Sequence, residues 1–599
     1  MQTRWTGEHG GVATSLLTVA LICVACISLA YFTYGRFLGR FFQLDPQKAT
    51  PAVEMQDGVD YVPIEPRFLL GQHFSAIAAA GPIVGPILAG LAFGWLPALL
   101  WILVGCIFIG GVHDFAALFA SIRHKACSIT EVVRQHMSRR AFLLFLAFIW
   151  IALVYIVVVF TDITASAFVG VVQLEDGSSI SGGAIATSSL LYLALPVVMG
   201  LLLRRGKLSL GWATAIFLPL VGVAIWAGPH IPFNLDKLLG IEVATGRKVW
   251  DVALLLYCLV ASLVPMWLLL QPRGHLGGYF LFLALAVGAL GLLFAGKTVA
   301  FPAFKGWNSE SNGPLFPMLF ILVACGACSG FHAIVSSGTT SKQLKRETDA
   351  RLIGYGAMLL EGLVAVISLC FVMMLAADDP LTKKAPNFIY ASGIGKFLAT
   401  VGIPTAVGIN FGLLAFTTFV YDTLDICTRL ARYIIEELTS WRSRWGRWFA
   451  TVASTVAPLC FVMNTTRDAK GNEIPAWKTF WDLFGASNQL LAALTLLGVT
   501  VWLARTRRTK GVWFILGLPT LFMYVMSTTA LVRWVRAGFF GRGGFHITSD
   551  PVPWVALVLV ALAAVMLVEA YRVLPRRTQP PEPYEALAAP ALPSAGAQG

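Results

Sequence analysis

The stretch that decides the fold runs from residue 71 to residue 90 and reads GQHFSAIAAAGPIVGPILAG. Two pairs, Gly81-Pro82 and Gly85-Pro86, lie in the middle of an apolar run long enough to cross a membrane. Each proline removes a backbone N–H donor and frees a carbonyl one turn earlier. Free backbone groups are not tolerated against lipid, so a span broken at 81–86 must be buried in protein or line a cavity. Secondary transporters build substrate and ion sites from such spans, although a proline kink without a ligand is the alternative.

The composition of the chain places it in a membrane. Of its 599 residues, 57% are hydrophobic and 13% are charged, which leaves too little polar surface for a soluble protein. The formal net charge of +13 does not indicate nucleic-acid binding, because the 44 Lys and Arg residues lie in short clusters between apolar runs. Topology-setting charges occupy such positions. We therefore predict an all-α polytopic membrane protein whose surroundings are the lipid bilayer.

Apolar runs predict about fifteen transmembrane helices on a window of about twenty residues. They lie near 13–35, 72–93, 95–121, 141–170, 186–203, 208–227, 249–270, 277–296, 315–338, 352–376, 402–428, 447–464, 482–504, 511–532 and 552–573. Basic residues, Arg273 among them, fall on alternate loops, which predicts an outer N-terminus and a cytoplasmic C-terminus. The loop 377–396, which is mixed in charge, is assigned to the outside.

A second broken span is predicted in the run 315–338. Small residues crowd its centre, and we expect the break at 326–332. By the alternation of basic loops the first broken span enters from the cytoplasm and the second from outside, which is the relation that an inverted repeat imposes.

Several motifs along the chain resemble the signatures of the carbon starvation protein (CstA) family. They are Gln72-His73-Phe74, Gly81-Pro82 with Gly85-Pro86, Asp114-Phe115, Ser329-Gly330-Phe331-His332-Ala333, Ser337-Gly338-Thr339-Thr340-Ser341-Lys342-Gln343, Gly354-Tyr355-Gly356 with Glu361, Leu424-Asp425 with Thr428-Arg429, and Trp481, Phe484-Gly485, Asn488-Gln489 and Leu491-Ala492. The resemblance covers residues 67 to 500. Two positions differ, because family members often have His where this chain has Gln72, and Thr where it has Asp422.

The resemblance implies a carrier of the bacterial inner (plasma) membrane that imports peptides or pyruvate when preferred carbon is scarce. It also implies kinship with the amino acid–polyamine–organocation superfamily, whose LeuT-like core has five-plus-five inverted repeats; a seven-plus-seven arrangement is the alternative. The expected divisions are an N-terminal span and cytoplasmic linker (1–66), a first repeat (67–228), two intervening helices (229–313), a second repeat (314–505), C-terminal spans (506–577) and a disordered cytoplasmic tail (578–599).

The predicted substrate site combines both broken spans. Unwinding near Pro82 and Gly330 would free helix N-terminal amides, whose partial positive charge suits a carboxylate. The candidate substrate-binding residues are Gly81, Pro82, Gly85, Pro86, Gly330, Phe331, His332, Ser337, Gly338, Thr339, Asn488 and Gln489.

Ionisable residues inside spans are the candidates for ion coupling, because a charge there is costly. Glu361 lies about ten residues into its helix, ~15 Å deep in a ~30 Å core. Burial favours the neutral form of a carboxyl group, as a proton carrier requires, although a carboxylate satisfied by local donors is the alternative. The other candidates are Asp162, Asp114, Thr418, Asp422 and Asp425.

Simpler roles are open for three of these candidates. Asp114 could pair with Arg123, and Asp425 could pair with Arg429 one helical turn away. Thr418, Asp422 and Asp425 share a helix face and offer oxygen ligands suited to Na⁺, so the coupling ion is H⁺ or Na⁺.

No motif for ATP hydrolysis or for a redox cofactor is present, so no cofactor is predicted. His73 and His332 are weak candidates for a metal site. These observations favour an ion-coupled importer of a small molecule, not an enzyme, with no nucleic-acid partner. An integral-membrane enzyme or a nutrient sensor that uses intramembrane His, Asp and Glu residues is the alternative, and the sequence makes no prediction of oligomeric state.

Overall fold

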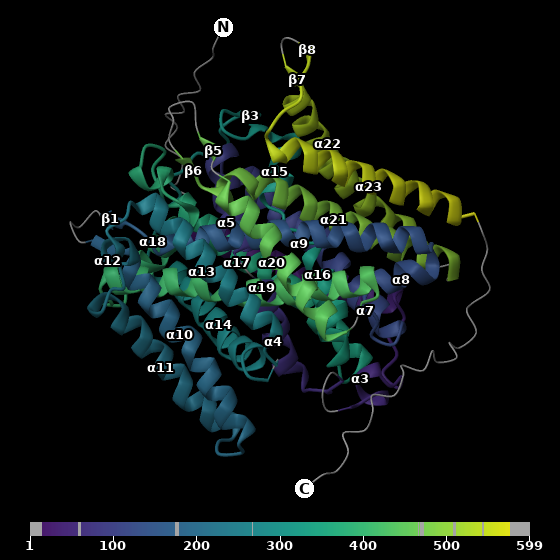
Figure 1. Cartoon of the computed structure of the whole chain (residues 1–599), viewed down its shortest axis with the longest axis horizontal. Coiled ribbons are helices and arrows are strands. Elements are labelled where there is room, and N and C mark those ends of the chain that lie inside the picture. The colour runs from purple at the N-terminus through teal and green to yellow at the C-terminus, as the bar shows by residue number, and fades with distance from the viewer. Residues whose placement is uncertain are drawn as a thin grey trace.

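The computed structural model describes residues 15–57, 61–78, 80–173, 179–265, 267–441, 443–464, 466–467, 473–506, 511–541 and 544–575. Within these residues the fold is a bundle of α-helices with four two-stranded antiparallel hairpins in its loops (Figure 1). The prediction of an all-α polytopic membrane protein is confirmed. The predicted disordered tail, 578–599, lies outside the described residues.

The helices of the first half are α1 (Leu16–Phe32), α2 (Tyr34–Phe41), α3 (Pro51–Glu54), α4 (Pro66–Ile77), α5 (Gly81–Phe93), α6 (Trp95–Gly105), α7 (Gly111–Arg123), α8 (Ile129–His136), α9 (Arg139–Ala167), α10 (Gly182–Arg204), α11 (Leu210–His230), α12 (Leu235–Leu239), α13 (Val243–Leu263) and α14 (Leu270–Phe294). Those of the second half are α15 (Leu315–Leu322), α16 (Phe331–Gly338), α17 (Ala357–Met373), α18 (Pro386–Ala399), α19 (Thr405–Thr439), α20 (Arg444–Met463), α21 (Ala476–Thr506), α22 (Leu518–Phe539) and α23 (Pro551–Val573).

The hairpins pair β1 (Val171–Gln173) with β2 (Ser179–Ser181), β3 (Asn308–Ser309) with β4 (Gly313–Pro314), β5 (Thr466–Arg467) with β6 (Glu473–Ile474), and β7 (Phe540–Gly541) with β8 (Gly544–Phe545). Turns of π-helix, η1 (Cys106–Gly110), η4 (Arg351–Gly356) and η6 (Trp513–Gly517), lead into α7, α17 and α22. Short 3₁₀ turns are η2 (Thr340–Lys342), η3 (Glu347–Asp349) and η5 (Pro380–Lys383).

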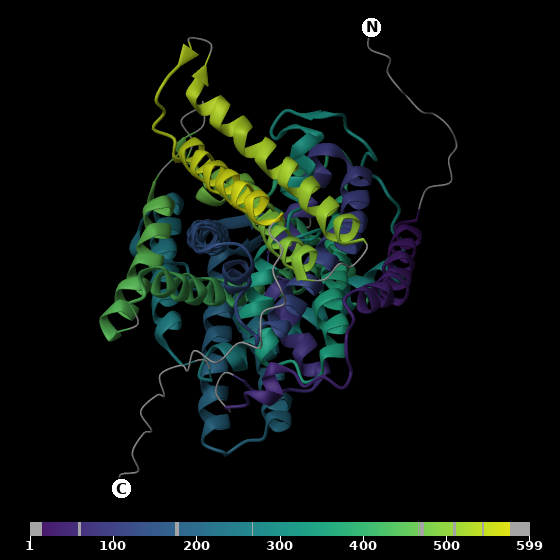
Figure 2. The same ribbon diagram turned by 90° about the vertical axis from the view of Figure 1, so that its right-hand side faces the viewer.

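Twelve helical segments of the described chain are individually long and apolar enough to cross a membrane, and α4 with α5 add one bent span. The remaining two predicted runs, 249–270 and 315–338, contain α13 and the pair α15 and α16. The segment through α21 is buried along its whole apolar window, and those through α17 and α19 nearly so, whereas α1, α11 and α23 are mostly exposed. In the turned view of Figure 2, α1 (purple) accordingly lies at the edge of the bundle.

The first broken span breaks slightly earlier than predicted. Helix α4 ends at Ile77, Ala78 has non-helical dihedral angles, and α5 begins at Gly81 with its axis turned by 49°. The prolines expected to form the break at 81–86 lie inside α5 instead. Pro82 lies in the first turn, where a proline loses no hydrogen bond because its N–H would be unpaired anyway, whereas Pro86 lies one turn later inside α5 and removes one. The Gly-Pro pairs therefore begin the second half-helix.

The second broken span is unwound over eight residues. Helix α15 ends at Leu322 and α16 begins at Phe331, so the non-helical stretch 323–330 overlaps the predicted break at 326–332. The two broken spans touch, since a Cβ atom added to Gly81 would lie 2.4 Å from the Cβ of Cys325.

Helix α18 corrects the assignment of 377–396 to an outer loop. It is a buried helix of 14 residues that packs against α19. Glycines permit this packing, because a Cβ atom on Gly395 would lie 2.6 Å from the side chain of Ile409 on α19. At about 1.5 Å per residue the helix is too short to cross a bilayer, and so no spanning run marked it.

Loops that the charge pattern assigns to the cytoplasm meet at one end of the bundle. The guanidinium of Arg123 pairs with the carboxylate of Glu347 at 2.5 Å. The N–H of Ile64 donates to the carbonyl of Gln343 at 3.1 Å.

Segments assigned to the outside also lie together. The N–H of Leu16 donates to the carbonyl of Lys297 at 3.0 Å, and the N–H of Ala300 donates to the carbonyl of Met373 at 2.8 Å. Segments that the alternation of basic loops assigns to the same side of the membrane therefore contact each other in the structure.

Candidate functional site

Four buried ionisable side chains meet beside the second broken span; we call them the Asp114 cluster (His113, Asp114, His332 and Glu361). The Nδ1 atoms of His113 and His332 lie 2.7 Å from the two carboxylate oxygens of Asp114. The Nε2 atom of His332 lies 3.2 Å from Oε2 of Glu361, within ion-pair distance but without hydrogen-bond geometry. All four side chains are fully buried. The cluster joins α7 to α16 and α17, and 218 residues separate Asp114 of α7 from His332 of α16.

Turns of π-helix precede two of these helices. The turn η1 leads into α7 just before His113, and η4 leads into α17 five residues before Glu361. Such turns rotate the side chains that follow them and often occur at functional sites. The two helices approach closely, because a Cβ atom on Gly354 would lie 2.9 Å from the Cα of Phe115.

Asn488 of α21 holds the unwound segment in place. Its side-chain oxygen accepts from the N–H of Phe331 at 2.9 Å, its backbone carbonyl accepts from the N–H of Gly330 at 3.1 Å, and its Nδ2 donates to Ser329 at 3.0 Å. The first amides of α16, expected to receive a substrate carboxylate, are therefore occupied in this structure. Asn488 thus positions the half-helix, and it lines neither of the two cavities described below.

The other residues predicted to bind substrate are mostly packed against protein. Gln489 donates to the carbonyl of Phe320, while the hydroxyls of Ser337 and Thr339 donate to carbonyls of their own helix. Gly338 lies at the end of α16. Pro82 and Pro86 are buried within α5.

Replacement of Asn488 by Ala is expected to destabilise the protein by about 1–3 kcal/mol, because the buried N–H of Phe331 would lose its acceptor. The measurement is the thermal midpoint of the purified protein in detergent. Thr495→Val is the matched control, since Thr495 lies on the same helix, is buried and makes no side-chain hydrogen bond. Equal midpoints for the two variants would contradict the positioning role.

Gly85 of α5 provides a second test of the packing. A Cβ atom there would lie 2.4 Å from the carbonyl oxygen of Leu322, so any side chain must push the two broken spans apart. We expect Gly85→Leu to abolish uptake while the protein still inserts into the membrane, since overpacking of this kind costs about 1–3 kcal/mol or more. Gly222→Leu on α11 is the control, because no atom lies within 4 Å of the added Cβ. Normal uptake by Gly85→Leu would contradict this contact.

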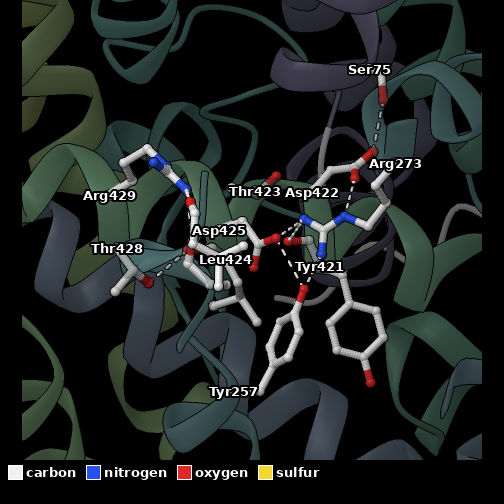
Figure 3. Close-up of polar contacts among 12 residues, drawn as sticks. Ser75, Tyr257, Arg273, Tyr421, Asp422, Thr423, Leu424, Asp425, Thr428 and Arg429 are labelled. Atoms are coloured by element: carbon white, nitrogen blue, oxygen red, sulfur yellow. Dashed lines mark hydrogen bonds and ion pairs between the residues drawn. The ribbon is translucent and has the colours of Figure 1, made fainter. Parts of the chain in front are cut away.

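A second buried group surrounds Arg273 of α14; we call it the Arg273 cluster (Ser75, Tyr257, Arg273, Asp422 and Asp425). The guanidinium lies between two carboxylates, with Nε 2.7 Å from Asp422 and Nη2 2.5 Å from Asp425 (Figure 3). It also donates to the hydroxyl of Tyr257, which in turn donates to Asp425 at 3.0 Å. Ser75 of the first broken span donates to the other oxygen of Asp422 at 2.9 Å.

The Arg273 cluster corrects two expectations. Arg273 was assigned to a basic loop, but it is fully buried within α14, because two carboxylates of α19 compensate its charge. The suggested pairing of Asp425 with Arg429 is wrong. Arg429 instead donates to the carbonyls of Ala261 and Val264, at the C-terminal end of α13, at 2.7 Å each.

The remaining candidates for ion coupling lie apart from one another. Asp114 does not pair with Arg123, which binds Glu347. Asp162 of α9 lies outside both clusters, where it accepts from the N–H of Trp477 at 2.8 Å and lies 3.4 Å from Arg247. The hydroxyl of Thr418 is buried without a hydrogen-bond partner.

No metal centre joins His73 and His332. Among the described residues no group of three or more His, Cys, Asp or Glu side chains is arranged to hold a metal ion. The Nδ1 atom of His73 lies 2.9 Å from the hydroxyl of Thr340 instead.

Two cavities lead toward the Arg273 cluster. A cavity of about 1120 Å³ opens at the end where the basic loops meet; Arg67, Gln72, Arg204, Gly274 and Gln343 are among its lining residues. A pocket of about 50 Å³ shares three of these residues and reaches farther inward; its lining includes Gln72, His73, Ser75, Gly274, Thr339, Gln343 and Asp422. Three predicted site residues therefore line this route: Thr339, Asp422 and the metal candidate His73.

Comparison with known proteins finds a family model and several transporters that match most of the chain. The family model of the carbon starvation protein CstA matches residues 13–387 and 377–530. The peptide transporter CstA of Helicobacter pylori is 31% identical, over 87% of this chain and 82% of that protein. The pyruvate/proton symporter BtsT of Escherichia coli is 31% identical, over 88% of this chain and 82% of that protein. The peptide transporter CstA of Bacillus subtilis is 30% identical, over 93% and 97%.

Among solved structures, a mutant of the manganese transporter of Eremococcus coleocola superposes with a TM-score of 0.46 at 13% identity, over 87% of this chain and 99% of that chain. The curated relatives are transporters and not enzymes. From the family match over most of its length, the chain belongs to the carbon starvation protein CstA family.

Proposed function

We propose that this protein is a proton-coupled symporter that imports peptides or a small carboxylate such as pyruvate across the bacterial inner membrane. One observation carries the coupling role: Glu361 is fully buried, neither of its oxygens has a hydrogen bond, and it lies 3.2 Å from His332. A carboxyl group with no donor to stabilise its charge is suited to binding and releasing a proton.

The Asp114 cluster suggests how the proton is handled. Asp114 fixes the ring of His332 through Nδ1, so that Nε2 faces Glu361. In the proposed cycle, Glu361 takes up a proton when the site opens to the outside and releases it when the site opens to the cytoplasm. Because an unpaired charge is costly at this depth, Glu361 exchanges its proton only when water has access.

A proton fits the described residues better than Na⁺. The carboxylates of Asp422 and Asp425, considered as Na⁺ ligands with Thr418, are both engaged by Arg273. The guanidinium already compensates one of the two negative charges, and both oxygens of Asp422 are taken, by Arg273 and Ser75. The relative named a pyruvate/proton symporter also supports proton coupling.

We also propose that the broken spans belong to two inverted repeats, residues 67–228 and 314–505, in a five-plus-five core. The contact of Gly81 with Cys325 supports this arrangement, because it places the two unwound stretches beside each other. The loops that carry most Lys and Arg residues then face the cytoplasm, with the N-terminus outside and the C-terminus inside.

The test is uptake by the purified full chain in vesicles, with labelled dialanine and labelled pyruvate under separate proton and Na⁺ gradients. We expect accumulation of at least one substrate when the outside is acidic, and no stimulation by a Na⁺ gradient. Accumulation driven by Na⁺ alone would refute the proton role, and saturable binding without any uptake would favour a sensor.

A further inference from the structure

The Arg273 cluster has the geometry of a carboxylate-binding site that a side chain of the protein already occupies. The Nε edge of Arg273 binds one oxygen of Asp422 at 2.7 Å, and the second oxygen of Asp422 accepts from Ser75. The Nη2 atom of the same edge donates to the carbonyl of Tyr421 at 2.7 Å and lies 2.5 Å from Asp425, so Nε is the donor that Asp422 uses. A substrate carboxylate could therefore replace Asp422 on Arg273 without any new donor.

The cluster lies at the inner end of the route from the large cavity. Asp422, Ser75 and Gly274, which follows Arg273, all line the small pocket. That pocket shares Gln72, Gly274 and Gln343 with the cavity of about 1120 Å³. The Asp422 side of the ion pair is therefore the side that an incoming ligand meets.

The net charge of a ligand decides whether it can separate the ion pair of Arg273 and Asp422. The cluster contains one guanidinium and two carboxylates, so a further anion would add an uncompensated negative charge to a buried site. A zwitterion adds no net charge. Its carboxylate can take the place of Asp422, while its ammonium pairs with the carboxylate that it displaced, so that every buried charge keeps a partner.

We propose that the Arg273–Asp422 pair recognises the two charged ends of a zwitterion, so that the substrate class is short peptides with free termini. Arg273 binds the α-carboxylate and Asp422 binds the α-ammonium. This rests on the proposed transport function and narrows it, since pyruvate supplies no cation for Asp422 and binds more weakly. Asp425 and Tyr257 keep the guanidinium in place throughout.

The test is competition against labelled dialanine on the purified full chain in lipid nanodiscs. The competitors are dialanine, N-acetyl-dialanine, which lacks the ammonium, dialanine amide, which lacks the carboxylate, and pyruvate. The wild type is expected to bind dialanine about tenfold or more tightly than each of the other three, because each leaves one buried charge unpaired.

Two variants test which side chain binds which charged end of dialanine. Asp422→Asn should lose the discrimination against N-acetyl-dialanine while it still discriminates against the amide. The double variant Arg273→Gln with Asp422→Asn should lose both, and it removes one charge of each sign, so the net charge of the cluster is unchanged. Arg429→Gln is the matched control, because this buried arginine on α19 binds only backbone carbonyls among its hydrogen-bonded partners and should leave both ratios unchanged.

A purely structural role for the pair would lower the amount of folded protein without changing these ratios. The proposal is overturned if the wild type binds pyruvate or N-acetyl-dialanine as tightly as dialanine, or if Asp422→Asn keeps its discrimination against N-acetyl-dialanine. If the wild type accumulates pyruvate under a proton gradient but does not bind dialanine more tightly than the other competitors, this inference is refuted and the proposed function stands.

Discussion

Glu361→Gln is expected to abolish proton-driven accumulation of substrate while substrate binding and exchange across the membrane continue. Glutamine has the shape of the neutral carboxyl group but cannot release a proton. The side chain is fully buried and has no hydrogen-bond donor, so the change should disturb the packing little. Accumulation in vesicles with an acidic exterior, compared with exchange of labelled for unlabelled substrate without a gradient, separates the two properties.

The control for Glu361→Gln is Glu569→Gln on α23. Glu569 is also largely buried, but it pairs with Arg572 at 3.4 Å and accepts from Ser138, far along the chain from the broken spans. Both accumulation and exchange should continue in this control. If Glu361→Gln still concentrates substrate when the outside is acidified, Glu361 is structural, and Asp162 is the next candidate.

Asp114→Asn is expected to lower the initial rate of uptake strongly and to destabilise the protein by about 3–5 kcal/mol, because loss of one partner from a buried charged pair leaves the other group uncompensated. Asp114 accepts from two histidines through its two oxygens. An asparagine offers one acceptor and one donor, so one of the histidines must turn or change tautomer. If that histidine is His332, its Nε2 no longer faces Glu361.

The measurement for Asp114→Asn is initial uptake as a function of external pH, with thermal stability recorded in parallel. We expect the pH profile to shift as well as the maximum rate to fall. A lower amount of folded protein with an unchanged profile would mean that Asp114 only supports the fold.

The sequence predicted the broken spans because proline and glycine act locally. The Gly-Pro pairs disfavour a continuous, straight helix from residue 71 to residue 90. The position of the break was less accessible, because a proline is tolerated inside the first turn of a helix, and so the break falls before Gly81 and not at it.

Three members of the Asp114 cluster could be named from sequence, but their contact could not. Asp114, His332 and Glu361 each attracted attention as ionisable residues within apolar runs. Asp114 and His332 are 218 residues apart, and their contact depends on how α7 packs against α16. Without an alignment of relatives, no local pattern reports such a pairing.

Arg273 was missed for a physical reason. A lone arginine near the start of an apolar run is usually read as the end of a span. Its true environment depends on Asp422 and Asp425, which lie on α19 about 150 residues later and supply the charge that permits burial. The signal available in the sequence was the pair of aspartates within another span, which predicts a nearby cation but does not identify it as Arg273.

The central claim is that substrate and proton cross the membrane together, and that Glu361 carries the proton. The most direct test is the internal pH of vesicles that contain the reconstituted protein and a trapped pH-sensitive dye, when substrate is added outside with no other gradient. The account predicts internal acidification that stops when the substrate is omitted and is absent in Glu361→Gln vesicles and in protein-free vesicles. Entry of labelled substrate into wild-type vesicles without acidification, or equal acidification with Glu361→Gln, would contradict it.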